Sequence, residues 1–108
     1  MTESAQASIE YAAGYQKNNI NKADIDRAIL DLQDMDEEHG AFWVTANRGH
    51  DQATLEVHQD MSLSFSMSQN VEDEVVATAK SWKQTAELYK MLVDGDFETV
   101  VKFFNSGL

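Results

Sequence analysis

Cysteine and proline are both absent from this 108-residue chain, and glycine is scarce. Without cysteine the chain can form no disulfide, no thiolate zinc site and no cysteine nucleophile. The five glycines are isolated, and none opens a helix after a buried strand, so the sequence has no glycine-rich phosphate loop. These absences disfavour nucleotide-dependent enzymes.

Long apolar runs are missing as well. No stretch approaches the roughly eighteen apolar residues that a membrane span needs. The start MTESAQAS has neither the basic nor the apolar region of a signal peptide. We therefore expect a cytoplasmic protein with no membrane partner. The length, with no repeat and no proline-rich linker, predicts one domain over residues 1–108.

Positive charge is the scarcest property of the chain. Eight lysine and arginine residues stand against nineteen aspartate and glutamate residues, which gives a formal charge of -11. Such a field repels the phosphates of nucleic acids and of anionic membranes, and it attracts basic proteins. We expect the partner to be another protein, and a basic one. The alternative is that the acidity simply keeps the protein soluble.

Alternating apolar and polar residues predict four strands. The first covers residues 5–15, where apolar residues fall on alternate positions: Ala5, Ala7, Ile9, Tyr11, Ala13 and Tyr15. The segments AFWVTAN and QATLEVHQ flank turn residues 47–51 and predict a hairpin with one buried face. Residues 61–68 alternate four apolar side chains with four serines, so they form the clearest predicted strand.

Apolar residues at helical spacing predict three helices. Asn21 can cap the first helix, with Asp24 at its positive end, and this helix is expected to end near His39 and Gly40. KNNIN before it is predicted to be a turn.

Asn70 is the predicted cap of the second helix, which opens with Glu72, Asp73 and Glu74 and ends at Gly95. The last segment, from residue 97, fits a helix better than a strand, with Phe103 off its apolar face. Together these elements predict an α+β fold, an antiparallel sheet of about four strands with helices packed on one face.

Acidic residues gather in the run DLQDMDEEHG. A calcium loop needs glycine at its sixth position and glutamate at its twelfth, but counting from Asp34 gives His39 and Thr45. We therefore expect no metal and no cofactor here, and we assign the run to contact with a basic partner. The predicted partner-binding residues are Asp31, Asp34, Asp36, Glu37 and Glu38.

Other chemistry has little support in the sequence. Glu56 and His58 share a strand face and could form a weak acid–base or metal pair. No positioned nucleophile or set of oxyanion donors accompanies them, so we expect no catalytic residue and no enzyme. Trp82 and Tyr89, one heptad apart, are expected in the core, whereas Trp43 could face either side of its strand.

The stretch KADIDRAILDLQDMDEEHGAFWVTA, followed by TLEVHQDMSLSFSM, resembles small cytoplasmic immunity proteins of bacterial polymorphic toxin systems. The resemblance lies in element order and acidity over residues 22–93, and it carries no site residues across. It implies a non-catalytic inhibitor that neutralises a basic toxin-like protein. The alternative is an acidic dimeric chaperone or adaptor for a secreted protein, a homodimer joined by its apolar C-terminal surface.

Overall fold

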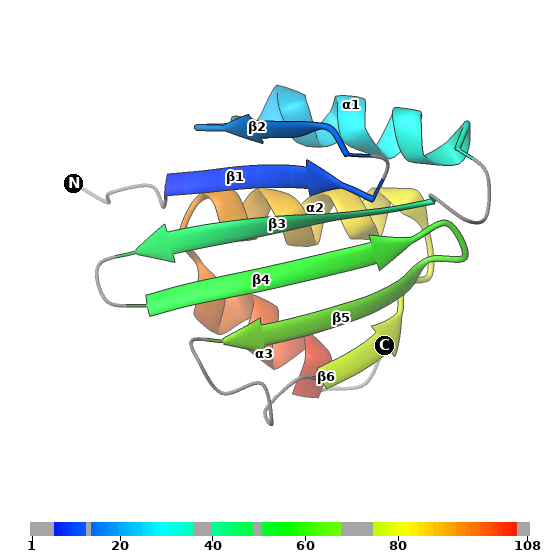
Figure 1. The fold of residues 1–108 in the computed structure, drawn as a ribbon. Helices are drawn as coiled ribbons and strands as arrows, with labels where there is room; N and C mark the ends of the chain where they lie inside the picture. The colour runs from blue at the N-terminus through cyan, green and yellow to red at the C-terminus, as the bar shows by residue number, and fades with distance from the viewer. Residues whose placement is uncertain (1–5, 13, 36–39, 49–50, 68–74, 106–108) are drawn as a thin grey trace.

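The structure is a computed structural model that describes residues 6–12, 14–35, 40–48, 51–67 and 75–105 (Figure 1). Within these residues six strands and three helices follow one another along the chain. They are β1 (Gln6–Tyr11), β2 (Gln16–Asn18), α1 (Lys22–Gln33), β3 (Ala41–Arg48), β4 (Asp51–His58), β5 (Ser62–Met67), β6 (Val75–Thr78), α2 (Trp82–Val93) and α3 (Phe97–Asn105).

The strands form one sheet in the order β2-β1-β3-β4-β5-β6. Every neighbouring pair is antiparallel. The predicted α+β class, with an antiparallel sheet and helices on one face, is therefore confirmed. The sheet has more strands than the predicted four, because β2 and β6 add one strand at each edge.

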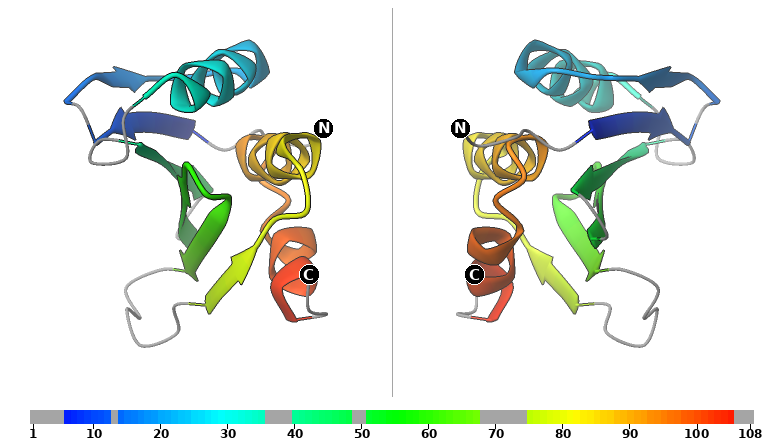
Figure 2. Two further views of the ribbon diagram at one scale, coloured as in Figure 1. Left: turned by 90° about the vertical axis from the view of Figure 1, so that its right-hand side faces the viewer. Right: turned by 90° about the vertical axis from the view of Figure 1, so that its left-hand side faces the viewer.

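The helices lie on one side of the curved sheet, as the edge-on views show (Figure 2). The side chains that face them include Ile9, Val44, Leu55 and Phe65, which are paired in register across β1, β3, β4 and β5 and are all buried. The buried apolar residues of sheet and helices form one cluster. None of the described helices is long and apolar enough to cross a membrane.

Tyr89 of α2 joins the helical layer to the middle of the sheet. Its side chain is fully buried, and its ring centroid lies 5.0 Å from that of Phe42. The hydroxyl donates to the carbonyl oxygen of Leu55 at 3.0 Å and lies 3.4 Å from that of Phe42. Burial raises the pKa of Tyr89 well above its usual value, so the phenol stays a neutral donor. The prediction that Tyr89 is a core residue is confirmed.

The first predicted strand is shorter than expected, and a second strand follows it. β1 ends at Tyr11, and the chain turns at Gly14, whose φ of 111° suits glycine. β2 then pairs with β1 through residues that include Lys17 and Asn18, where the sequence predicts a turn. The backbone of this segment finds partners on the free edge of β1, which local propensity cannot anticipate.

Helix α1 begins as predicted but ends early. Asn21 and Asp24 form a reciprocal capping box, with bonds of 3.1 Å and 2.9 Å. The helix ends at Gln33, not near His39, which lies outside the described residues. The last turn of α1 has no basic residue, and the helix dipole disfavours the acidic side chains that follow.

A side chain from the β4–β5 turn satisfies the carbonyl groups at the end of α1. The Gln59 amide donates to the carbonyl oxygen of Leu32 at 3.2 Å and also to that of Met35. The Leu32 carbonyl also accepts from the Met35 backbone amide at 3.2 Å, so the side chain of Gln59 adds a donor to a turn that already closes the end of α1.

The prediction of the second helix is wrong for its first residues. Residues 75–78 form β6, an edge strand paired with β5, because valine and threonine suit a strand and β5 offers an unpaired edge. The predicted cap Asn70 and the acidic residues 72–74 lie outside the described residues. Ser81 caps α2 instead by accepting from the Gln84 amide at 3.1 Å.

The C-terminal part of the chain follows the prediction more closely. Gly95, with a φ of 84°, comes directly after the Asp94 that caps α2. The ambiguous last segment is the helix α3. Phe103, expected to lie off the apolar face, is partly buried against the core and contacts Phe104 edge-on, so it is not an isolated exposed side chain.

The position of Tyr89 leads to a stability prediction. Tyr89→Phe removes a buried donor from two sheet carbonyl groups while keeping the ring, so we expect it to lower the free energy of unfolding by about 1–2 kcal/mol. Urea unfolding followed by circular dichroism measures the change. Tyr15→Phe is the control, because Tyr15 is 54% exposed and should lose almost nothing. Equal losses in the two variants would show that the Tyr89 hydroxyl does not hold α2 on the sheet.

Candidate interaction surface

The structure places two of the five predicted partner-binding residues, both at the end of α1. Asp31 is engaged within the chain: it accepts from the Tyr11 hydroxyl at 3.2 Å and from Arg27 Nε at 3.3 Å. Asp34 is exposed at the C-cap of the helix. The other three, Asp36, Glu37 and Glu38, lie outside the described residues.

The bond between Tyr11 and Asp31 also fixes α1 to β1. Burial, the negative charge of Asp31 and the hydrogen bond to it together raise the pKa of Tyr11 to about 12. At neutral pH the phenol is therefore a permanent donor to Asp31. The carboxylate of Asp31 therefore has a structural role within the chain, whether or not it also contacts a partner.

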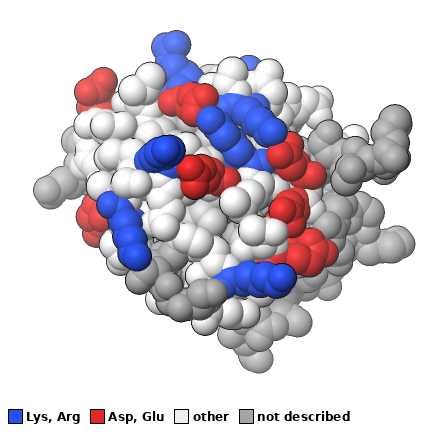
Figure 3. Space-filling model, turned by 180° about the vertical axis from the view of Figure 1, so that it is seen from behind, with Lys and Arg blue, Asp and Glu red and all other residues white. Residues whose placement is uncertain are grey.

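The side of the molecule that the helices cover carries charges of both signs. Figure 3 shows this side, where lysine and arginine side chains lie among aspartates and glutamates. Exposed ion pairs of this kind stabilise little, but they neutralise one another locally. The pairs that involve α1 are Lys17–Asp24 at 2.8 Å, Lys22–Asp94 at 2.9 Å, Lys90–Asp26 at 3.0 Å and Arg27–Asp31 at 3.3 Å.

The opposite side of the sheet is covered by no described helix, and we call it the open face. Side chains alternate between the two faces of each strand, so the strand pairing assigns every residue to a face. Among the strand residues whose side chains the structure describes, no lysine or arginine falls on the open face. One row of it crosses all six strands: Gln16, Glu10, Trp43, Glu56, Ser64 and Val76.

Trp43 stands near the middle of this row. The sequence left its direction undecided, and the structure turns it to the open face, where it is half-buried. Glu10 on β1 and Glu56 on β4 lie directly opposite it on its two neighbouring strands. Directly opposed residues have Cβ atoms about 5 Å apart, so two carboxylates flank one indole ring. Such an arrangement favours a cation above the ring.

Hydroxyl groups occupy much of the remaining open face. Thr45 and Thr54 face each other with their oxygens 3.3 Å apart. Ser62, Ser64 and Ser66 of β5 lie on the same side, as the alternation predicts. These short polar side chains leave the indole of Trp43 as the largest group of the described open face.

The predicted pair Glu56 and His58 is brought together on this face. His58 Nε2 lies 2.6 Å from Glu56 Oε2. A catalytic zinc site uses three protein ligands, whereas the described residues contain no group of three or more potential metal ligands. Within that part of the chain the pair is a hydrogen bond between two exposed side chains.

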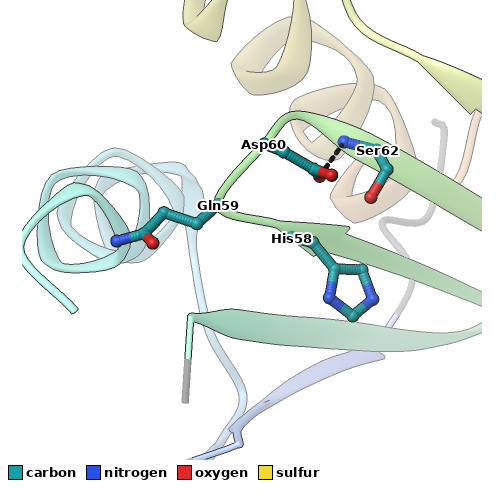
Figure 4. A pocket seen from close by; sticks show the side chains of 4 residues that line it. All are labelled: His58, Gln59, Asp60 and Ser62. Atoms are coloured by element: carbon teal, nitrogen blue, oxygen red, sulfur yellow. Dashed lines mark hydrogen bonds between the residues drawn. The ribbon is translucent and has the colours of Figure 1, made fainter. Parts of the chain in front are cut away.

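A hollow of about 540 Å³ lies at the β4–β5 turn, lined by His58, Gln59, Asp60 and Ser62 (Figure 4). Hydrogen bonds from the side chain and the backbone of Ser62 lower the pKa of Asp60, and the backbone bond measures 2.9 Å. Gln59 points toward α1, and His58 points away from Asp60. These polar groups stabilise the turn, and their directions do not assemble a nucleophile with a base.

Comparisons with protein families, with characterised proteins and with solved structures find no match for this chain. The function must therefore be inferred from the chain's own surfaces.

Sequence reasoning missed the grouping of Glu10, Trp43 and Glu56. The alternation in residues 5–15 already places Glu10 on the other face of its strand from the buried Ile9 and Tyr11. A similar alternation places Glu56 on the other face from Leu55 and Val57. What the sequence lacks is the register between strands, which depends on tertiary packing and turn geometry.

The raised pKa of Tyr11 predicts alkaline destabilisation. Its contribution to stability is complete below the unfolded value of 10.0 and is lost as the pH rises through about 12, because the unfolded chain gives up the proton first. The raised pKa of Tyr89 also lowers the free energy of unfolding at alkaline pH. The effect of Tyr11 alone is therefore isolated by comparing wild type with Tyr11→Phe. We expect the difference in unfolding free energy between wild type and Tyr11→Phe to shrink from about pH 8 to about pH 11. A difference that stays constant between these conditions, measured by urea unfolding, would contradict the assignment.

Proposed function

We propose that this chain is a non-catalytic protein-binding domain of the inhibitor or immunity type, which neutralises a basic partner protein docked on the open face. The observation that carries the proposal is the row in which Trp43 stands between Glu10 and Glu56, on a face whose described strand side chains include no lysine or arginine.

Charge supports this choice of partner. The net charge of -11 draws a basic protein toward the molecule from a distance. On the helical side the approaching protein meets lysines such as Lys22 and Lys90 beside the acids. On the open face it meets Glu10 and Glu56 with no lysine or arginine among the described strand side chains. The imidazole of His58 lies 2.6 Å from Glu56, so docking there brings fewer like charges together than on the helical side.

The composition of the open face suits a protein interface. Tryptophan is among the residues that most often dominate binding energy, especially near the centre of a contact. Threonine and serine hydroxyls around it supply polar contacts of the kind found at interface rims. Six strands about 4.8 Å apart span on the order of 25 Å, a width that suits one side of a small specific interface.

The alternative function, a homodimeric adaptor, and the alternative docking site, the acidic end of α1, have less support. A homodimer joined by the apolar C-terminal surface would need free aromatic side chains, but Phe103 and Phe104 pack against the core. The acidic end of α1 stays a predicted contact, with Asp34 exposed and Asp31 held by Tyr11 and Arg27. It is tested below beside the open face.

The test uses three variants that each add one positive charge. Ser64→Lys places a cation beside Glu56 on the open face, Gln33→Lys places one near Asp34, and Asn105→Lys places one at the exposed end of α3. Wild type and variants are used to capture proteins from the source cells at low and moderate salt, and the retained proteins are identified by mass spectrometry. We expect a basic protein to be retained by wild type and by Asn105→Lys, and lost with Ser64→Lys.

Neutralisation is then measured directly. The captured protein is purified, and its activity is followed as the wild-type chain is added. We expect the activity to fall to its minimum near one chain per partner. A partner lost with Gln33→Lys but kept with Ser64→Lys would move the interface to the end of α1. Tight binding without loss of the partner's activity would rule out an inhibitor and favour an adaptor.

A further inference from the structure

The central three residues of the open face form a rigidly placed group. Glu10, Trp43 and Glu56 stand on three adjacent strands, β1, β3 and β4, and the register of two antiparallel ladders holds them in one row. No loop has to close to assemble them. Their backbone positions are thus set before any partner arrives, so that only side chains need to be ordered on binding.

Both carboxylates have capacity for another donor. Glu10 forms no ion pair with any other described residue. Glu56 accepts from His58 through Oε2, and a carboxylate has about four lone-pair sites, so its other oxygen can still accept. An incoming cation therefore meets two acceptors, one on each side of the indole.

We infer that Trp43, Glu10 and Glu56 together bind the guanidinium group of an arginine side chain presented by the basic partner. The inference rests on the proposed function and specifies its central contact. A guanidinium is planar and can lie flat on the indole face, while its N–H groups point outward toward carboxylates at the ring edges.

Other occupants fit this group less well. A lysine ammonium is a compact, strongly hydrated point charge, which cannot cover the indole and reach both carboxylates in one plane. A second copy of the chain would bring its own Glu10 and Glu56 against the first pair, so like charges would face each other. An arginine of a basic protein satisfies the indole and both acids at once.

The first measurement follows the fluorescence of Trp43. The chain has two tryptophans, so a Trp82→Phe background leaves Trp43 as the reporter. The probes are three blocked peptides of one length, with arginine, lysine or citrulline between glycines. Citrulline keeps the planar shape of arginine without its charge. We expect a saturable change in emission with the arginine peptide, a weaker one with lysine and none with citrulline.

Variants then locate the binding site. Glu10→Gln and Glu56→Gln each remove one negative charge without changing size, and we expect each to weaken binding of the arginine peptide about fivefold. Glu87→Gln is the matched control, because Glu87 is an exposed acid on α2. Circular dichroism establishes that each variant keeps the fold.

Equal responses to arginine and citrulline, or an equal loss with Glu87→Gln, would overturn the inference. The two proposals can also fail separately. If a natural basic partner is captured through the open face but ignores Glu10→Gln and Glu56→Gln, the arginine contact is wrong and the proposed function stands. If the arginine peptide binds at Trp43 but no protein docks on the open face, the proposed function is wrong, and only the guanidinium site itself stands.

Discussion

The burial of one sheet face beneath α2 is the constraint on which the rest of the structure depends. Tyr89 shows how it is met: a large side chain is fully buried, and its hydroxyl donates to Leu55 in the middle of the sheet. Once the helices occupy one side, the period of two along each strand decides which residues remain outside. The open face is thus a consequence of core packing.

The same constraint gives the open face its chemistry. Val44 and Leu55 must point inward, so their neighbours Trp43 and Glu56 must point outward. A tryptophan that is half-buried on the outer face of a sheet contributes little to the core, whereas its ring offers a large surface to a partner. Its place between two acids suits a cation above the ring, which is the contact that we propose.

Local sequence predicted the elements whose pattern had one reading. The hairpin of β3 and β4, strand β5, the N-cap Asn21 and the glycine after α2 all follow from period and capping chemistry. Residues 75–78 were predicted to be helical, because Val75, Ala79 and Trp82 fit a helical stripe, and that prediction is wrong. The free edge of β5 decided in favour of β6. Tertiary structure determines which strand edge is free, which strand β2 pairs with and which face Trp43 occupies. Local sequence does not contain this information.

Charge acts at two distances in this molecule. The excess of eleven negative charges is a property of the whole chain, so it steers any basic protein and selects none. Selection requires a fixed geometry at short range, where desolvated contacts outweigh the screened field. On the helical side acids and bases such as Asp94 and Lys22 already satisfy one another. On the open face the row around Trp43 has acceptors and an aromatic surface but no cation among its described strand residues, so a partner can supply it.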